Sequence, residues 1–188
     1  MKRACVFLAD GFEEIEGLTV VDILRRGGVE VTTVSIKEEL SVTGRSNITV
    51  LADQTFRQTD FSKTDLLVLP GGMPGTTNLR DYEPLKALLK KFQEERRLLG
   101  AICAAPMIFG GLGFLQGRKA TIYPGMEEKL EGAIPVTDRV VTDGHITTSR
   151  GMGTAIAFSL SLLGQLEGEE KAEEIKRSIV YGHGNFAP

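Results

Sequence analysis

The sequence predicts an α/β fold built around a mainly parallel β-sheet. Short apolar runs rich in branched residues alternate with longer amphipathic stretches, which is the pattern of β-α-β units. Each run is nearly all apolar, as expected of strands that helices cover on both faces. The 188 residues are enough for one full core and fall short of the usual length of two domains, so we expect a single domain over residues 1–188.

Cap and turn residues divide the chain into elements. Buried strands are predicted for residues 4–9, 29–35, 65–69 and 98–102. Helices are predicted for residues 13–26, 83–97, 104–110, 153–163 and 169–180, the second of them opened by Asp81. Alternating residues at 41–51 predict a small antiparallel hairpin. The pair Asp143-Gly144 predicts a turn between two further short strands, near residues 140–141 and 146–148.

Composition and charge argue against several classes of protein. A net charge of −3 and a pI near 5.5 make nucleic acid a poor main partner, because phosphate contacts need a concentrated basic face. The first apolar stretch is too short for a signal peptide, and no stretch approaches the roughly 18 apolar residues of a spanning helix. We therefore expect a cytoplasmic protein without a membrane partner. Cys5 and Cys103 lie far apart and are expected to be free thiols.

Cys103 lies where the predicted strand at 98–102 gives way to a helix of small residues. This is the strand-turn-helix setting of a nucleophile elbow, in which a tight turn projects the side chain away from the sheet. The positive end of the helix dipole would favour the thiolate, so a lowered pKa is expected for Cys103. The alternative for a lone cysteine is a small buried apolar residue, and the mid-strand position of Cys5 favours that alternative for Cys5.

Two other loops are expected near Cys103, because ligands of an open parallel sheet bind beyond the carboxyl ends of its strands. One loop contains Gly71-Gly72, whose backbone N–H groups could approach a carbonyl oxygen or an oxyanion. The alternative is a tight turn in an exposed loop. The other loop leads into Glu13, Glu14 and Glu16, and any of these three could serve only to complement the helix dipole.

Four blocks of residues, in this order and spacing, resemble the ThiJ/PfpI superfamily. Within it, the chain is most similar to the branch of a parkinsonism-associated deglycase and its bacterial relatives. The resemblance implies a flavodoxin-like three-layer sandwich that usually forms a homodimer. The blocks are Gly11-x-Glu13-Glu14-x-Glu16, Leu69-Pro70-Gly71-Gly72, Ala101-Ile102-Cys103-Ala104-Ala105-Pro106 and Thr148-Ser149-Arg150-Gly151-x-Gly153-Thr154.

The resemblance also implies roles for individual residues. Cys103 would be the catalytic nucleophile, and Glu16 would be the protonated acid whose hydrogen bond stabilises the sulfur anion. The backbone N–H groups of Gly72 and Ala104 would bind an oxyanion, with Gly71 in support.

The chain departs from the pattern of the superfamily at the block before Pro124. Many members have a histidine where this chain has Tyr123, and neither His145 nor His183 fits that position. Without a histidine base, cysteine protease activity is not expected. Tyr123 is instead a candidate for contacting the substrate.

Several side chains are candidates for binding an anion or reaching a second subunit. Relatives often offer a basic or polar side chain of the hairpin to the cysteine of the neighbouring subunit, and Arg45 and Ser46 compete for that role here. Arg26 and Arg150 could bind an anion near the site, although an ion pair within the chain is the simpler explanation for each.

The leading functional hypothesis is a cysteine-dependent enzyme of the glyoxalase or protein-deglycase type. Cys103 would add to a reactive dicarbonyl, either a small aldehyde or an adduct on a glycated protein, and Glu16 would move protons. No metal or organic cofactor would be needed. The second hypothesis is a non-catalytic oxidative-stress sensor or redox chaperone that works through oxidation of Cys103. A third follows an older family label in thiazole monophosphate biosynthesis, for which the sequence offers no phosphate-binding glycine loop.

Overall fold

A seven-stranded sheet forms the centre of the computed structural model, which describes residues 1–182. Its strand order is β10-β11-β7-β6-β1-β2-β5. All neighbouring strands are parallel except β10 and β11, which are antiparallel. The strands are β1 (Arg3–Leu8), β2 (Glu30–Ser35), β5 (Gln54–Thr55), β6 (Leu66–Leu69), β7 (Leu98–Ile102), β10 (Val140–Asp143) and β11 (Ile146–Ser149).

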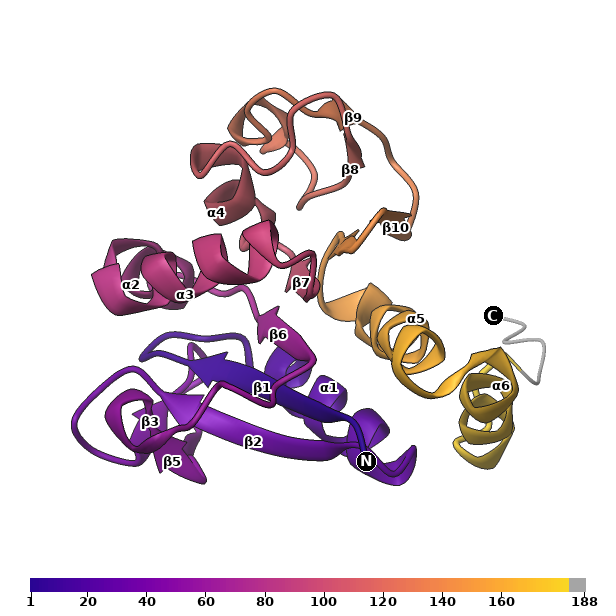
Figure 1. Ribbon diagram of the computed structural model, residues 1–188, viewed down its shortest axis with the longest axis horizontal. Helices are drawn as coiled ribbons and strands as arrows, with labels where there is room; N and C mark the ends of the chain where they lie inside the picture. The colour runs from indigo at the N-terminus through magenta and orange to yellow at the C-terminus, as the bar shows by residue number, and fades with distance from the viewer. Residues whose placement is uncertain (183–188) are drawn as a thin grey trace.

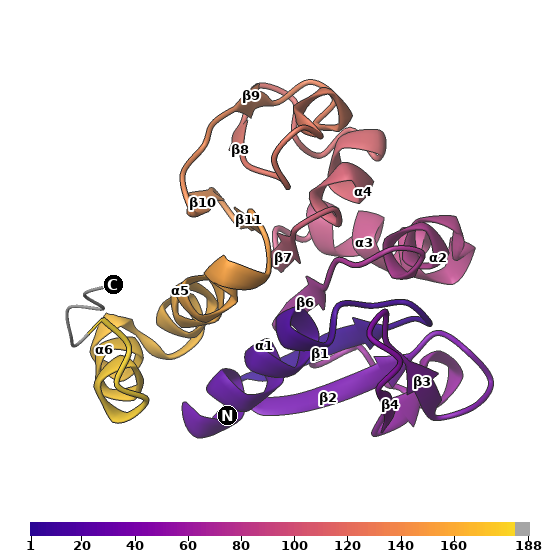
Figure 2. The ribbon, with the colours of Figure 1, turned by 180° about the vertical axis from the view of Figure 1, so that it is seen from behind.

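Helices cover both faces of this sheet, so the predicted three-layer sandwich is confirmed. Successive residues of a strand point to opposite faces. In β1, Val6 and Leu8 therefore join the core beneath one helical layer, while Cys5 and Phe7 join the other. Figure 1 shows α2 and α3 on one side of β6 and β7 and α5 on the other, and Figure 2 shows α1 from behind. One layer comprises α1 (Glu14–Arg26), α5 (Ala155–Glu167) and α6 (Glu169–Ser178), and the other comprises α2 (Gly75–Asp81), α3 (Glu83–Glu94) and α4 (Pro106–Gly111).

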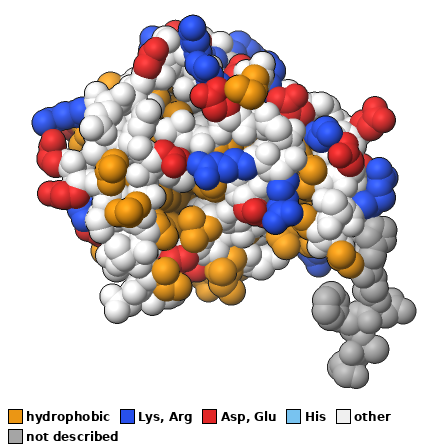
Figure 3. All heavy atoms as spheres, turned by 90° about the horizontal axis from the view of Figure 1, so that it is seen from below, with side chains coloured by type: hydrophobic (Ala, Val, Ile, Leu, Met, Phe, Trp, Pro, Cys, Tyr) orange, Lys and Arg blue, Asp and Glu red, His pale blue; other side chains and the backbone are white. Residues whose placement is uncertain are grey.

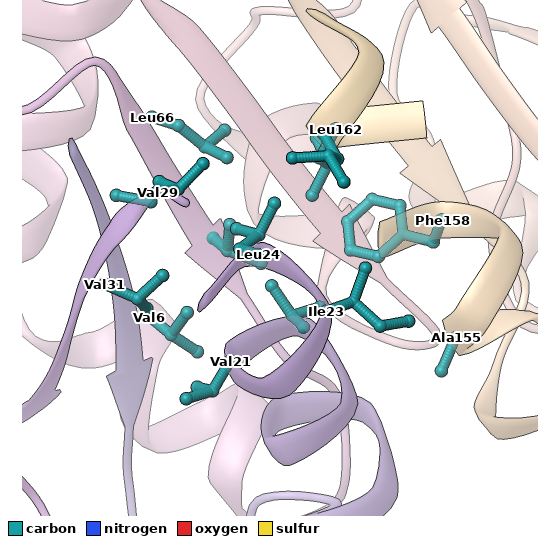
Figure 4. Packing of buried hydrophobic residues seen from close by; sticks show 14 of the residues in the cluster. Val6, Val21, Ile23, Leu24, Val29, Val31, Leu66, Ala155, Phe158 and Leu162 are labelled. Carbon is teal, nitrogen blue, oxygen red and sulfur yellow. The ribbon is translucent and has the colours of Figure 1, made fainter. Parts of the chain in front are cut away.

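The packing of α1 against α5 fixes the orientation of α1 on the sheet. Ile23 and Leu24 of α1 meet Phe158 and Leu162 of α5, and none of the four side chains is more than 2% exposed (Figure 4). Burying one such side chain stabilises the fold by about 1.5–3 kcal/mol. The first turn of α1, which carries Glu14 and Glu16 and is preceded by Glu13, is thereby held at the carboxyl end of β1.

The order of the strands places three loops next to one another. From β1 the chain continues to β2 on one side and later enters β6 on the other side, so the connections reverse direction at β1. Ligands of such sheets bind beyond the strand ends at this point of reversal. The loops after β1 and β6 flank it, and the turn after β7 lies beside them.

Two small sheets lie outside the main one. The predicted hairpin is confirmed as β3 (Ser41–Thr43) paired with β4 (Thr49–Leu51). A second pair, β8 (Lys119–Ala120) and β9 (Ile134–Pro135), is parallel and was not predicted, because two-residue strands leave no periodic pattern. Short 3-10 helices span Phe56–Gln58, Glu127–Lys129 and Met152–Thr154.

Several predicted helix boundaries were wrong. The helix expected at 83–97 ends at Glu94, and Arg96 has a left-handed φ of 54°, which ends the helical path. Asp81 does not open that helix, because it is the last residue of α2. The sequence did not predict α2, since it begins Gly-Thr-Thr-Asn, all weak helix formers. The last two helices also shift, to the ranges given above for α5 and α6.

The surface carries charges of both signs with apolar patches between them, as one face shows in Figure 3. Within residues 1–182, no helix is both long enough and apolar enough to cross a membrane.

Candidate active site

Cys103 occupies a sharp turn directly after β7. Its φ is 63°, in the left-handed region that costs a non-glycine residue roughly 1–2 kcal/mol. Hydrogen bonds on both sides hold this strained backbone. The Cys103 N–H donates to the Ser149 carbonyl oxygen at 3.0 Å, and the Cys103 carbonyl accepts from the Tyr123 N–H at 2.9 Å. The predicted elbow geometry is therefore present, but the helix expected from residue 104 begins only at Pro106, a favoured first position for proline.

Glu16 lies in the first turn of α1 and is 1% exposed. Its Oε2 accepts a hydrogen bond from the Gly71 N–H at 2.9 Å, and its carboxyl is also hydrogen-bonded to the Cys103 side chain. Of the three glutamates in this block, Glu16 is thus the one that meets the thiol.

Gly71 makes the contact between thiol and carboxyl possible. A Cβ atom at residue 71 would lie 2.6 Å from the Cβ of Cys103 and 2.7 Å from Oε2 of Glu16. Both distances are too short for any side chain to be accommodated without displacing one partner. The alternative of an exposed turn for Gly71-Gly72 is wrong, because both residues are buried.

The two acids of the site influence each other. Burial raises the pKa of Glu16 to about 7, while hydrogen bonds from Cys103 and from the Gly71 N–H oppose that rise. Burial, followed by the negative charge of Glu16, raises the pKa of the Cys103 thiol to about 12. The expectation of a lowered pKa for Cys103 is wrong. The sulfur is partly buried against a second acid, and Cys103 lies three residues before α4, whose dipole was expected to lower the pKa.

Two backbone N–H groups oppose the rise in the pKa of Cys103. They belong to Ala104 and Gly72, and both form hydrogen bonds to the sulfur that favour its anion. Gly72 has a φ of 88°, and a Cβ atom there would lie 2.5 Å from the Glu13 backbone nitrogen. Only glycine therefore lets this loop bring its N–H to the sulfur.

A pocket of about 270 Å3 opens above the sulfur. It is lined by Arg45, Gly72, Met73, Cys103, Ala104, Tyr123 and Met126. Met73 and Met126 were not among the site residues predicted from the sequence. The position of Met73 directly after Gly71-Gly72 could have identified it, whereas the position of Met126 depends on an irregular loop that no pattern predicts.

The hairpin contributes Arg45 to this pocket of its own chain. Arg45 Nη1 lies 3.4 Å from Oε2 of Glu13. Ser46 is placed differently, because its backbone N–H donates to Oε1 of Glu14 at 2.9 Å and it does not line the pocket. Glu13 and Glu14 thus hold the hairpin turn against the start of α1.

Neither of the other two arginine candidates lines the pocket. Arg26 is the last residue of α1 and forms an ion pair with Asp22 at 2.6 Å, which is the simpler of the two explanations given for it from the sequence. Arg150 follows β11, and its guanidinium donates to the Thr137 carbonyl at 2.9 Å. It also lies 4.0 Å from the Glu127 carboxylate.

The remaining cysteine and histidines lie away from Cys103 or outside the described residues. Cys5 is 3% exposed in the middle of β1, which confirms the prediction of a small buried residue at this position. Its sulfur contacts the Thr64 hydroxyl at 3.6 Å. His145 precedes β11, whereas Cys103 follows the opposite end of the neighbouring β7. His183 is outside the described residues. Both cysteines are free thiols, as expected.

Comparison with known proteins gives consistent matches. The profile described as the DJ-1/PfpI family matches residues 2–165. Protein DJ-1 homolog B of Arabidopsis thaliana is 42% identical over 95% of this chain, which spans only 41% of that relative's length. Glutathione-independent glyoxalase DJR-1.2 of Caenorhabditis elegans is 30% identical over 95% of the chain and 96% of its own length. The structure of oxidized Toxoplasma gondii DJ-1 superimposes with a TM-score of 0.93 at 33% identity, covering 97% of this chain and 100% of its own.

The raised pKa of Glu16 predicts that stability falls as the pH rises. Between its ordinary value of 4.5 and about 7, the folded state holds a proton that the unfolded state has lost. The free energy of unfolding should therefore drop across this window by on the order of 3 kcal/mol. Urea unfolding at pH 5 and pH 8 measures the drop, and Glu16→Gln should abolish most of it.

Glu39→Gln is the matched control, because Glu39 is exposed. This variant should keep the pH dependence of the wild type. If the drop persists in Glu16→Gln, another group causes it and Glu16 is not the buried acid of raised pKa.

Proposed function

Because the chain belongs to the DJ-1/PfpI family, we propose that it converts reactive 2-oxoaldehydes to 2-hydroxy acids through a hemithioacetal on Cys103. The observation that supports this most is the hydrogen-bonded pair of Cys103 and Glu16 beneath an open pocket. The name of the C. elegans relative, a glutathione-independent glyoxalase, agrees with the same chemistry. The reaction needs no organic cofactor, since sulfur and carboxyl supply the nucleophile and the proton carrier.

The reactive state of the Cys103–Glu16 pair is the one in which the two residues share a single proton. Two strongly interacting acids titrate as a unit, so the value near 7 belongs to loss of the first proton and the value near 12 to loss of the second. In between, the remaining proton can reside on either partner. When it resides on Glu16, Cys103 is a thiolate that accepts hydrogen bonds from the carboxyl O–H and from two backbone N–H groups.

The thiolate then adds to the aldehyde carbon. A carbon–sulfur bond forms, and the electron pair of the carbonyl moves to its oxygen. The N–H groups of Ala104 and Gly72, which lie against the sulfur, are suited to stabilise the new oxyanion. Glu16 donates its proton to that oxygen and becomes a carboxylate, which completes the hemithioacetal.

Proton transfer between two carbons completes the conversion. The Glu16 carboxylate removes the hydrogen from the former aldehyde carbon and passes this proton to the neighbouring ketone oxygen, which gives an enediol. Glu16 then takes the proton of the hydroxyl on the sulfur-bearing carbon and delivers it to the adjacent carbon, which gives a thioester. Water hydrolyses the thioester to the 2-hydroxy acid and restores the thiol. The substrate gains one molecule of water overall, and one carbon is oxidised while its neighbour is reduced, so no external oxidant is required.

The pocket also suits early adducts of dicarbonyls on protein amino groups, which is the deglycase form of the hypothesis. Met73 and Tyr123 on its rim are both about half exposed, so the opening faces solvent.

The proposal places the protein in the reducing cytoplasm, where the Cys103 thiol is maintained. Protease activity has no support, because no histidine of residues 1–182 reaches Cys103 to serve as its base.

Turnover of methylglyoxal tests the proposal. The purified protein should release lactate without glutathione, and Cys103→Ser should lower kcat/KM by at least about a thousandfold, because its hydroxyl is a far weaker nucleophile. Glu16→Gln should lower kcat by a similar factor, since the amide cannot carry the proton. Enzymatic assay of D- and L-lactate measures both effects.

The control for these variants is Cys5→Ser, because Cys5 lies within β1 away from the pocket. It should retain wild-type turnover. Lactate release at the same rate by Cys103→Ser would remove the cysteine from the mechanism.

A second candidate function is sensing of oxidants through Cys103. The sulfur is partly exposed, and the same three hydrogen-bond donors could bind the oxygens of a sulfinate. The solved T. gondii relative is described as oxidized, which agrees with such chemistry in the family.

Mild peroxide treatment followed by peptide mass spectrometry distinguishes this candidate. Sensing predicts that Cys103 gains two oxygens at low peroxide doses while Cys5, which is buried, stays reduced. Glu16→Gln should slow this addition or let it proceed to the sulfonate. Equal oxidation of both cysteines, or none at Cys103, would contradict a sensing role.

The family resemblance and one apolar surface favour a homodimer. Ile15 and Leu18 of α1 and Ile48 and Leu51 of the hairpin are between 38% and 77% exposed. Glu14 ties these two elements together, because its Oε1 accepts from the Ile48 N–H at 3.4 Å and from the hairpin turn. A second copy of the chain would remove this apolar surface from water.

Sedimentation equilibrium measures the oligomeric state. The wild type should be a dimer at micromolar concentration, and the double variant Ile15→Lys, Ile48→Lys should be a monomer. Ile134→Lys, at an equally exposed site on β9, is the control that should remain dimeric. A monomeric wild type would refute the dimer.

A further inference from the structure

Three apolar side chains, Met73, Tyr123 and Met126, form one wall of the pocket around Cys103. Met73 and Tyr123 are 52% and 51% exposed, and Met126 is half-buried beside them. Exposed apolar surface that lines a concave site is surface available to a ligand. Methionine side chains adapt their shape and make favourable contacts with aromatic rings through sulfur.

This wall is anchored to the elbow itself. The Tyr123 N–H donates to the carbonyl oxygen of Cys103 at 2.9 Å, and the Met126 N–H donates to the Tyr123 carbonyl at 3.1 Å. The Tyr123 ring lies over Gly151, where a Cβ atom would be 3.5 Å from it. Met73 follows Gly72, whose N–H contacts the sulfur. The backbone that carries the three apolar side chains is therefore held close to the reacting sulfur.

The pocket has more room than a three-carbon substrate uses. Its volume of about 270 Å3 is close to the roughly 300 Å3 at which pockets for drug-sized ligands begin. Methylglyoxal is much smaller than such ligands, so bound at Cys103 it would leave the apolar wall in contact with water.

Charge does not compete for this space. Apart from the reacting sulfur, Arg45 is the charged side chain among the described residues that line the pocket, and the Glu13 carboxylate lies 3.4 Å from its guanidinium. The cation is thus partly neutralised within the chain. The pocket consequently favours a neutral apolar substituent over an anionic one.

We propose that Met73, Tyr123 and Met126 form a specificity pocket that selects 2-oxoaldehydes carrying an aromatic or bulky apolar group over glyoxal and methylglyoxal. This inference rests on the proposed function, because it names the substrate class of the same site. The aldehyde carbon meets the sulfur, while the group on the ketone carbon replaces water against the two methionines and the tyrosine ring.

The test compares kcat/KM for phenylglyoxal with kcat/KM for methylglyoxal. The wild type should prefer phenylglyoxal by at least about tenfold, which is the usual discrimination from added apolar contact. The double variant Met73→Gln, Met126→Gln keeps the length of both side chains but makes them polar, and it should lose most of this preference. The double variant Met73→Leu, Met126→Leu keeps them apolar and should retain it.

Alkylation of Cys103 provides a readout that does not need turnover. Phenacyl bromide and bromoacetone both alkylate the thiolate with loss of bromide, and their rates on glutathione give the intrinsic ratio. The wild type should favour phenacyl bromide by about tenfold beyond that ratio, and the glutamine variant should not.

The two measurements separate the two proposals. If no dicarbonyl is turned over but the alkylation preference is present and lost in the glutamine variant, the enzyme proposal fails and the specificity pocket stands. If dicarbonyls are turned over with equal kcat/KM, or if the glutamine variant keeps the preference, the specificity pocket is refuted.

Discussion

The site depends on the hydrogen bond between two acids, Cys103 and Glu16, of which Glu16 is buried and Cys103 is only partly exposed. Neither acid can ionise without regard to the other, because a second negative charge beside the first is costly in a buried setting. This constraint leaves one proton on the pair between about pH 7 and about pH 12. When the Glu16 carboxyl holds this proton, Cys103 is a thiolate and can act as the nucleophile. When Glu16 has given the proton up, its carboxylate can act as the base. The same pair of residues therefore supplies both the nucleophile and the base.

The fold supplies the constraint from three separate segments. Helix α1 brings Glu16 in from the end of β1, and its packing against α5 fixes its direction. The loop after β6 brings Gly71, whose lack of a side chain permits the approach and whose N–H binds the carboxyl. The turn after β7 brings the sulfur, at the cost of a left-handed backbone conformation. The strain at Cys103 is sustained because its backbone is hydrogen-bonded on both sides, to Ser149 of β11 and to Tyr123.

The fold and the loops that meet at the site could be predicted from the sequence for physical reasons. The alternation of apolar runs and amphipathic stretches specifies a parallel sheet, and the sheet specifies that loops at the carboxyl ends of strands meet. Selecting Glu16 from three glutamates required the family resemblance, since all three lie within four residues at the start of α1. The raised pKa of Cys103 could not be predicted, because it depends on burial and on a carboxyl that is distant in sequence. Met126 escaped prediction for a related reason, since an irregular loop carries it to the pocket.

The most direct test of the shared proton is the ultraviolet absorbance of the thiolate as a function of pH, with the Cys103→Ser signal subtracted. The account predicts two steps: a partial rise near pH 7, when the pair loses its first proton, and the remainder near 12. In Glu16→Gln the rise should collapse to a single step. A wild-type sulfur that shows no absorbance until far above neutral pH would place the whole charge on Glu16 and contradict the account.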